Sequence, residues 1–185
     1  MQTDEELSKT KNLVIRQIIV KMNGKGRIHI GENNVIHPWV RFMSEGGDIR
    51  IGSKNIFEEK TVIYNKSSTN PMVIGDENYF KIGSKIYSSN IEDLNEFGIN
   101  CHVDESRIGT GNLIADEVKV KLGETLLEKK SYALNGNVID NLAFSEKRKA
   151  MIILMIRNTT DAYKNSMSKV MDRSKVVPST TSVGK

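Results

Sequence analysis

The sequence has few of the residues that staple, kink or anchor a chain: one cysteine, three prolines and one tryptophan among 185 residues. A single cysteine excludes an internal disulfide and a cysteine-based zinc site. The longest apolar run, "AMIILMI", is far too short to cross a bilayer. The first residues, "MQTDEELSKTKN", are polar and partly acidic, unlike a signal peptide. We therefore expect a soluble cytoplasmic protein without membrane insertion.

Charge of one sign is not concentrated anywhere in the chain. The net charge is +4, and no block of lysine and arginine indicates a nucleic-acid surface. Hydrophobic residues make up 38% and charged residues 27%, which is typical of a globular chain. The length corresponds to roughly one domain.

What the sequence does contain is a repeat of aliphatic or aromatic residues every six positions. A half-buried strand repeats every two residues and a helix every three or four, so neither explains the period. Five triplets share it: Ile30/Ile36/Phe42, Ile51/Phe57/Ile63, Ile74/Phe80/Ile86, Ile91/Phe97/Val103 and Ile108/Ile114/Val120.

Further columns follow these anchors. The residue after each first anchor is glycine in four triplets and Glu92 in the other. Four residues after the first anchor every triplet has asparagine: Asn34, Asn55, Asn78, Asn95 and Asn112. Four residues after the second anchor the residue is small, and Cys101 falls in this column. We interpret Cys101 as a packing residue rather than a nucleophile.

The columns predict a triangular coil with one short strand on each of its three sides. Anchors point inward, glycine relieves crowding at the turn, and asparagine tolerates left-handed backbone angles. Stacked asparagine side chains are expected to hydrogen-bond to one another up the column. One coil cannot bury its aliphatic residues, but stacked coils can. A two-layer sandwich with accidental spacing is the alternative. The pattern resembles the hexapeptide repeat of left-handed parallel β-helices, and the handedness is implied by that resemblance.

The regions around the repeat define four segments. We expect a disordered N-terminus over residues 1–12, a left-handed β-helix over 13–140, a C-terminal helix over 141–173 packed on the β-helix, and a disordered tail over 174–185. Leu126, Tyr132 and Val138 continue the six-residue step and suggest a terminal coil. Ser145 is the expected N-cap of the helix, and "RNTTD" is expected to break or bend the helix near Asn158.

The outward positions just before the second anchors form an apolar stripe. These positions hold Val35, Ile56, Tyr79, Glu96 and Leu113. A stripe of this length should be covered, either by the C-terminal helix or by a partner protein. Two long insertions, "MSEGGDIR" and "YNKSSTNPMV", leave from one corner of the coils and carry loops.

The candidate metal ligands are His29, His37 and His102. His102 lies three coils away from His37, about 14 Å of stacking, whereas zinc needs ligand atoms at about 2 Å. We therefore expect no metal, no cofactor and no catalytic residue. Enzymes with this repeat, namely carbonic-anhydrase-like hydratases and acyltransferases that use an interface histidine, remain the alternative function.

A more specific resemblance lies in "VIHPWVRFMSEGGDIRIGSKNIFEEKTVIYN" and "PMVIGDENYF". These segments are similar to the first coils of the dynactin subunit 6 family, most clearly at His37-Pro38 and over residues 51–59, and the likeness extends over residues 18–170. The resemblance implies a non-catalytic structural and adaptor subunit of the dynactin pointed-end complex on the cytoskeleton. It implies dynactin subunit 5, the pointed-end actin-related protein and dynactin subunit 4 as partners, with dynein and cargo adaptors as indirect ones.

The sequence also suggests where such a partner would bind. Trp39 lies outward beside Pro38 and Arg41, and tryptophan and arginine dominate interface hot spots. The candidate interface residues are Trp39, Arg41, Val35, Ile56, Tyr79 and Leu113.

Overall fold

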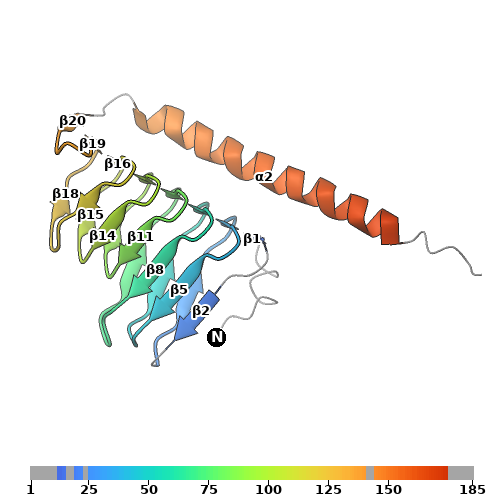
Figure 1. The fold of residues 1–185 in the computed structure, drawn as a ribbon, viewed down its shortest axis with the longest axis horizontal. Helices are drawn as coiled ribbons and strands as arrows, with labels where there is room; N and C mark the ends of the chain where they lie inside the picture. Colours follow the sequence, from blue (N-terminus) through green and yellow to red (C-terminus); the bar gives the residue numbers. More distant parts are fainter. Residues whose placement is uncertain (1–11, 16–18, 23–24, 141–143, 175–185) are drawn as a thin grey trace, which may run out of the picture.

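The computed structural model describes residues 12–15, 19–22, 25–140 and 144–174. The predicted disorder of residues 1–12 and 174–185 therefore falls almost wholly outside the described residues. Short strands form three sheets that face one another as the sides of a triangular prism, and one helix runs along it (Figure 1). The predicted left-handed parallel β-helix is confirmed.

We call the sheets A, B and C. Sheet A has eight strands in the order β1 (Leu13–Val14), β4 (Val35–Ile36), β7 (Ile56–Phe57), β10 (Tyr79–Phe80), β13 (Glu96–Phe97), β16 (Leu113–Ile114), β19 (Lys130–Tyr132) and β20 (Val138–Asp140). Sheet B has six: β2 (Ile19–Met22), β5 (Arg41–Ser44), β8 (Val62–Asn65), β11 (Lys85–Tyr87), β14 (His102–Asp104) and β17 (Lys119–Val120).

Sheet C also has six strands: β3 (Ile28–Ile30), β6 (Ile49–Ile51), β9 (Met72–Ile74), β12 (Asn90–Ile91), β15 (Arg107–Ile108) and β18 (Thr125–Leu126). All strand pairs among the described residues are parallel except β19 with β20. The register joins each anchor to the same anchor of the next coil, as in Ile36 to Phe57 and Phe80 to Phe97. The six-residue period therefore measures the step from one side of the prism to the next.

The anchors form one continuous core inside the prism. Phe57, Phe80 and Phe97 stack nearly parallel in sheet A, with ring centroids 4.8 and 4.7 Å apart. These distances match the strand spacing, so the ring column follows from the coil repeat. Cys101 is fully buried in the same core.

The asparagine column forms a ladder through the main chain. The Oδ1 of Asn34, Asn55, Asn78 and Asn95 each accepts a hydrogen bond from the main-chain N–H of the next asparagine, as in Asn55 N–H to Asn34 Oδ1 (2.8 Å), and Asn112 Oδ1 accepts from Lys130 N–H. The predicted hydrogen bonds between asparagine side chains are therefore corrected: the ladder joins each side chain to the main chain of the next coil. The expected left-handed angles fall one residue earlier, at Asn33, Lys54, Glu77, Leu94 and Gly111.

Glycine after the first anchor is required by the close stacking of the turns. A Cβ at Gly52 would lie 2.1 Å from Asp76 Oδ1 and 2.7 Å from the Gly75 carbonyl oxygen. Two neighbouring backbones approach each other here, which leaves no room for a side chain. The crowding predicted at this column is present.

Three local predictions were wrong. Leu126 continues the sixfold step, but the chain then turns back, and Val138 lies in β20, which pairs antiparallel with β19 and is exposed. A hairpin therefore ends the stack in place of a terminal coil. Helix α2 (Phe144–Ser174) is continuous, without a break near Asn158, and begins one residue before the expected N-cap Ser145. No helix in the described part of the chain is long and apolar enough to span a membrane.

Candidate interaction surfaces

The apolar stripe on the outside of sheet A is covered by helix α2. Val35, Ile56 and Tyr79 form a buried cluster with Ile152, which is fully buried. Met155 and Ile156 pack against the same cluster. Ile152 and Ile156 are four residues apart and share one face of the helix. Of the two covers expected for the stripe, the structure therefore contains the helix, and three predicted interface residues are occupied within the chain.

Beyond Tyr79, at Glu96, the stripe becomes polar. Lys81 Nζ lies 2.5 Å from Glu96 Oε1, and the Tyr79 hydroxyl donates a hydrogen bond to Glu58. Burial, followed by the hydrogen bond to Glu58, raises the pKa of Tyr79 well above its ordinary value. Leu113 is half-buried at the end of the stripe.

One buried carboxylate ties the helix to the coils. Glu77 has 9% of its side chain exposed, and its two oxygens lie 3.2 Å from Lys54 Nζ and 3.6 Å from Lys149 Nζ. Lys149 lies in the second turn of α2, so this pair fixes the helix start over sheet A. Removing either cation would leave a buried charge with less compensation.

Trp39 and Arg41 are placed at the corner between sheets A and B. Trp39 is 49% exposed and has a φ of 61°, an uncommon conformation for a bulky residue. Ile82 and Ile99 are also exposed at this corner, two and three coils further along. Arg41 is exposed at the start of β5. The corner is therefore the part of the predicted interface that remains available to a partner.

The three histidines do not converge. His29 is exposed on sheet C, and His37 Nδ1 lies 3.1 Å from Glu59 Oε1 at the corner between sheets A and B. His102 lies on the outside of sheet B. No group of three or more His, Cys, Asp or Glu among the described residues could hold a metal ion. Burial raises the pKa of the Cys101 thiol to about 12, which makes it a poor nucleophile.

Sheet B carries an aromatic and cationic outer surface that the sequence analysis did not single out. Tyr64 and Tyr87 meet edge to face at 6.0 Å, and Tyr87 meets the His102 ring at 4.9 Å. Lys66 lies 4.9 Å over the Tyr87 ring and also binds Asp104 at 2.7 Å. The sequence pattern could have revealed this surface. Tyr64 and Tyr87 each follow the third anchor of their triplet, so the repeat places them on adjacent strands in register.

Burial and the surrounding lysines lower the pKa of His102. Burial is the largest cause, and Lys85, Lys66 and Lys119 act in the same direction, whereas Asp104 opposes them. Lys85 and Lys119 flank His102 in the outward column of sheet B. The surface is therefore positively charged along one line of the prism.

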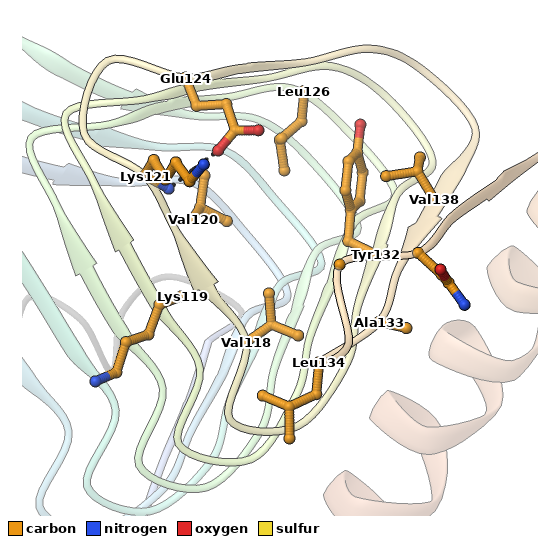
Figure 2. A pocket seen from close by; sticks show the side chains of 12 residues that line it. Val118, Lys119, Val120, Lys121, Glu124, Leu126, Tyr132, Ala133, Leu134 and Val138 are labelled. Atoms are coloured by element: carbon orange, nitrogen blue, oxygen red, sulfur yellow. Dashed lines mark hydrogen bonds between the residues drawn. The ribbon is translucent and has the colours of Figure 1, made fainter.

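The end of the stack beyond β17 is open, and its lining mixes apolar side chains with Lys119, Lys121 and Glu124 (Figure 2). Val118, Val120, Leu126 and Tyr132 surround a cavity of about 220 Å³, with Leu134 among the lining residues. The β19–β20 hairpin stands beside it and raises sheet A above the ends of the other two sheets. Sequence reasoning placed a regular coil here and so did not expect an open end.

Comparison with known proteins identifies relatives for about half of this chain. It is 38% identical over 88 residues to dynactin subunit 6 of Caenorhabditis elegans, covering 48% of this chain and 49% of the relative. The chain is similar to dynactin subunit 6. The dynactin subunit 6 of Danio rerio is 31% identical over 108 residues (52% and 55% covered), and that of Nematostella vectensis 30% over 115 residues (56% and 62%). The resemblance to dynactin subunit 6 inferred from the sequence is thereby confirmed.

The similarity to dynactin subunit 6 covers only part of each chain. The chain spans about half the length of the relatives it matches. No family model matches the chain.

Solved structures confirm the fold. A proposed acetyltransferase from Bacillus cereus superposes with a TM-score of 0.65 at 17% identity, over 86% of this chain and 95% of that one. A hexapeptide transferase family protein from Anaplasma phagocytophilum gives 0.62 at 13% identity, over 83% and 92%. At these identities the likeness shows the β-helix and does not carry an activity.

Proposed function

We propose that this chain is a non-catalytic structural and adaptor subunit of dynactin. The observation that carries the proposal is the similarity to proteins named dynactin subunit 6 in several animals. The absence of convergent histidines in the described residues agrees with a binding role. The β-helix presents flat, rigid faces, which suit a subunit whose task is to hold other proteins.

The finer role follows from the family resemblance. In this proposal the chain belongs to the pointed-end complex, pairs with the related β-helix of dynactin subunit 5, and lies near the pointed-end actin-related protein and dynactin subunit 4. It supports dynein-driven transport along microtubules and the choice of cargo adaptors, in the cytoplasm on the cytoskeleton.

The docking surface we assign to this role combines the corner around Trp39 with the outside of sheet B. Trp39 and Arg41 are exposed, and Arg41 begins strand β5, in which Met43, two residues further on, pairs with Tyr64; Tyr64 in turn pairs with Tyr87 on the next strand. Aromatic rings and arginine concentrate binding energy in protein interfaces. Val35, Ile56 and Tyr79 are left out of this surface because α2 buries them.

The competing function is an enzyme of the same fold, because the two structural neighbours are named as transferases. An acyltransferase would need a histidine base at a subunit interface, and a carbonic-anhydrase-like hydratase three histidines on one zinc. His37 is engaged with Glu59, and His102 contacts Tyr87 and lies near Asp104. The described histidines form no three-histidine zinc site, and the similarity to dynactin subunit 6 favours the dynactin role.

The test is affinity purification of the tagged chain from its native cells. We expect the other dynactin subunits to co-purify, with no zinc in the complex. Trp39→Ala should reduce their recovery several-fold, whereas Val73→Ala, an exposed apolar residue on sheet C, should leave it unchanged. A zinc-bearing homotrimer that contains no dynactin subunit would overturn the proposal.

A further inference from the structure

The open end of the stack exposes the edges of two sheets. In the described part of the chain β17 pairs only with β14, and β18 only with β15. His102 N–H donates to the Val118 carbonyl, so in a parallel ladder the N–H and C=O of Lys119 point toward the open side. Edges of this kind are templates for an added strand.

The same end gathers large apolar side chains that are exposed. Five exceed half exposure: Leu122 (69%), Leu127 (65%), Leu134 (66%), Val138 (55%) and Ile139 (62%). The cavity beside β17, about 220 Å³ in volume, is smaller than the roughly 300–1,000 Å³ of small-molecule sites. Val120, Leu126 and Leu134 line it together with Lys121 and Glu124, so it suits one or two side chains of a polypeptide better than a cofactor.

The open end could bind either a second whole β-helix or a single extended segment, and its shape favours the segment. β19 and β20 add two layers to sheet A above β16, while sheets B and C stop at β17 and β18. A second copy with a flat terminal coil would meet this hairpin before its strands reached β17. A single extended segment would lie along β17 beside the hairpin, next to the cavity that Val120 and Tyr132 line together with Lys121 and Glu124 (Figure 2).

The charge of the neighbouring column defines the chemistry of that segment. Lys85, His102 and Lys119 lie on adjacent strands in register and point outward. The next residue in this column would lie directly above Lys119, where an acidic side chain is favoured and a basic one disfavoured. The alternate residues would point into the cavity, where aliphatic side chains are favoured.

We propose that β17 accepts an extended segment of a partner protein in which acidic residues alternate with aliphatic ones, so that the segment becomes a further strand of sheet B. Main-chain hydrogen bonds to Lys119 provide affinity, and the cavity lined by Val120, Leu126 and Tyr132 selects the aliphatic residue. The inference does not depend on the dynactin role, because it uses only the open end of this chain.

The test uses the full chain and a fluorescent synthetic peptide, Ser-Glu-Val-Glu-Val-Glu-Ser. We expect saturable binding in fluorescence polarisation. It should weaken at least fivefold when lysine replaces glutamate in the peptide or when the amide of the second valine, which follows the central glutamate, is N-methylated. Lys119→Glu should weaken binding of the glutamate peptide by a similar factor and improve binding of the lysine peptide.

The matched control is Lys85→Glu, which removes an exposed lysine from the same column two strands away from the edge. It should change the affinity less than twofold. Leu134→Glu, at an exposed lining position, should weaken binding while leaving the unfolding midpoint unchanged. The proposal is overturned if the peptide does not bind, if Lys119→Glu and Lys85→Glu act equally, or if the N-methylated peptide binds as well. Self-association of the free chain that Leu134→Glu abolishes would also overturn it, because a second copy would then be the occupant.

Discussion

At the scale of single residues, the asparagine column sets the turn geometry of every coil. Asn55 uses both ends of its amide: Oδ1 accepts from Asn78 N–H, and Nδ2 donates to the Gly75 carbonyl at 3.0 Å. Asn78 accepts from Asn95 N–H at 2.9 Å, but its buried Nδ2 has no hydrogen-bond partner. The equivalent acceptor would be the carbonyl of Glu92, which instead accepts from Asn95 Nδ2.

This difference predicts unequal costs for two equivalent substitutions. Asn55→Ala loses two hydrogen bonds and leaves a buried N–H and a C=O unpaired, so we expect the free energy of unfolding to fall by about 3 kcal/mol. Asn78→Ala loses one hydrogen bond and should cost about 1–2 kcal/mol. Urea denaturation of both variants measures the difference. Equal costs, or a larger cost for Asn78→Ala, would contradict the assignment.

Cys101 is predicted to be unreactive while the chain is folded. With its pKa raised to about 12 by burial, the thiolate fraction at pH 8 falls from about one quarter to about one in ten thousand. Because only the thiolate reacts, the ratio of these two fractions predicts that alkylation by iodoacetamide is at least about 1,000-fold slower in the folded chain than in the denatured chain. Mass spectrometry of timed reactions gives the rate. A rate within tenfold of the denatured chain would show that the thiol is accessible.

His102 is expected to make the fold less stable in acid. Its folded pKa lies below the ordinary value of 6.5, first because of burial and then because of Lys85, Lys66 and Lys119, with Asp104 opposing. The unfolded chain therefore binds the proton more readily, and stability decreases as the pH falls through 6.5 toward the folded pKa.

An NMR titration of the His102 ring checks this directly. We expect a midpoint below 6.5 that moves upward in Lys85→Gln, because a neighbouring cation is removed. His102→Gln should show a smaller loss of stability between pH 7.5 and 5 than the unaltered chain. A midpoint above 6.5 would mean that Asp104 outweighs burial and the lysines.

At the scale of elements, the contact between α2 and sheet A depends on one face of the helix. Ile152 is fully buried against Val35, Ile56 and Tyr79, whereas its neighbour Ile153 is 44% exposed. Ile152→Ala should lower the free energy of unfolding by about 2–4 kcal/mol, and Ile153→Ala by less than about 0.5 kcal/mol. Chemical denaturation of the pair measures this. Similar effects for both would place the helix in a different rotation from the one described.

The elements also show which parts of the structure could be predicted from sequence. The five coils, their inward residues and the helix follow from periodicity, because burial imposes the period directly. The hairpin at Val138 could not be read from spacing, since Val138 keeps the sixfold step while its strand runs antiparallel. The candidate interface could be predicted from sequence only in part. Trp39 is exposed as expected, but the sequence pattern does not say whether α2 or a partner covers Ile56, because that depends on how the helix packs.

At the scale of the whole molecule, the coil stack and the helix are separable in principle. Each coil buries its anchors against its two neighbours, so the core inside the prism makes no use of α2. The helix runs along sheet A and extends past β1 (Figure 1). Its described contacts are with the stripe and Glu77. Its contribution is therefore to cover one outer face.

A chain that ends at Asp140 is therefore expected to keep its strands but expose the stripe of Val35, Ile56 and Tyr79. Circular dichroism should retain the β signal, while dye binding and sedimentation should report exposed apolar surface and association. A peptide of residues 144–174 added in trans should reverse both effects. The same peptide with Ile152→Asp should fail, and that with Ile153→Asp should succeed, because only Ile152 enters the buried cluster. A truncated chain that stays monomeric and binds no dye would show that the stripe needs no cover, and the assignment of α2 as its cover would then be wrong.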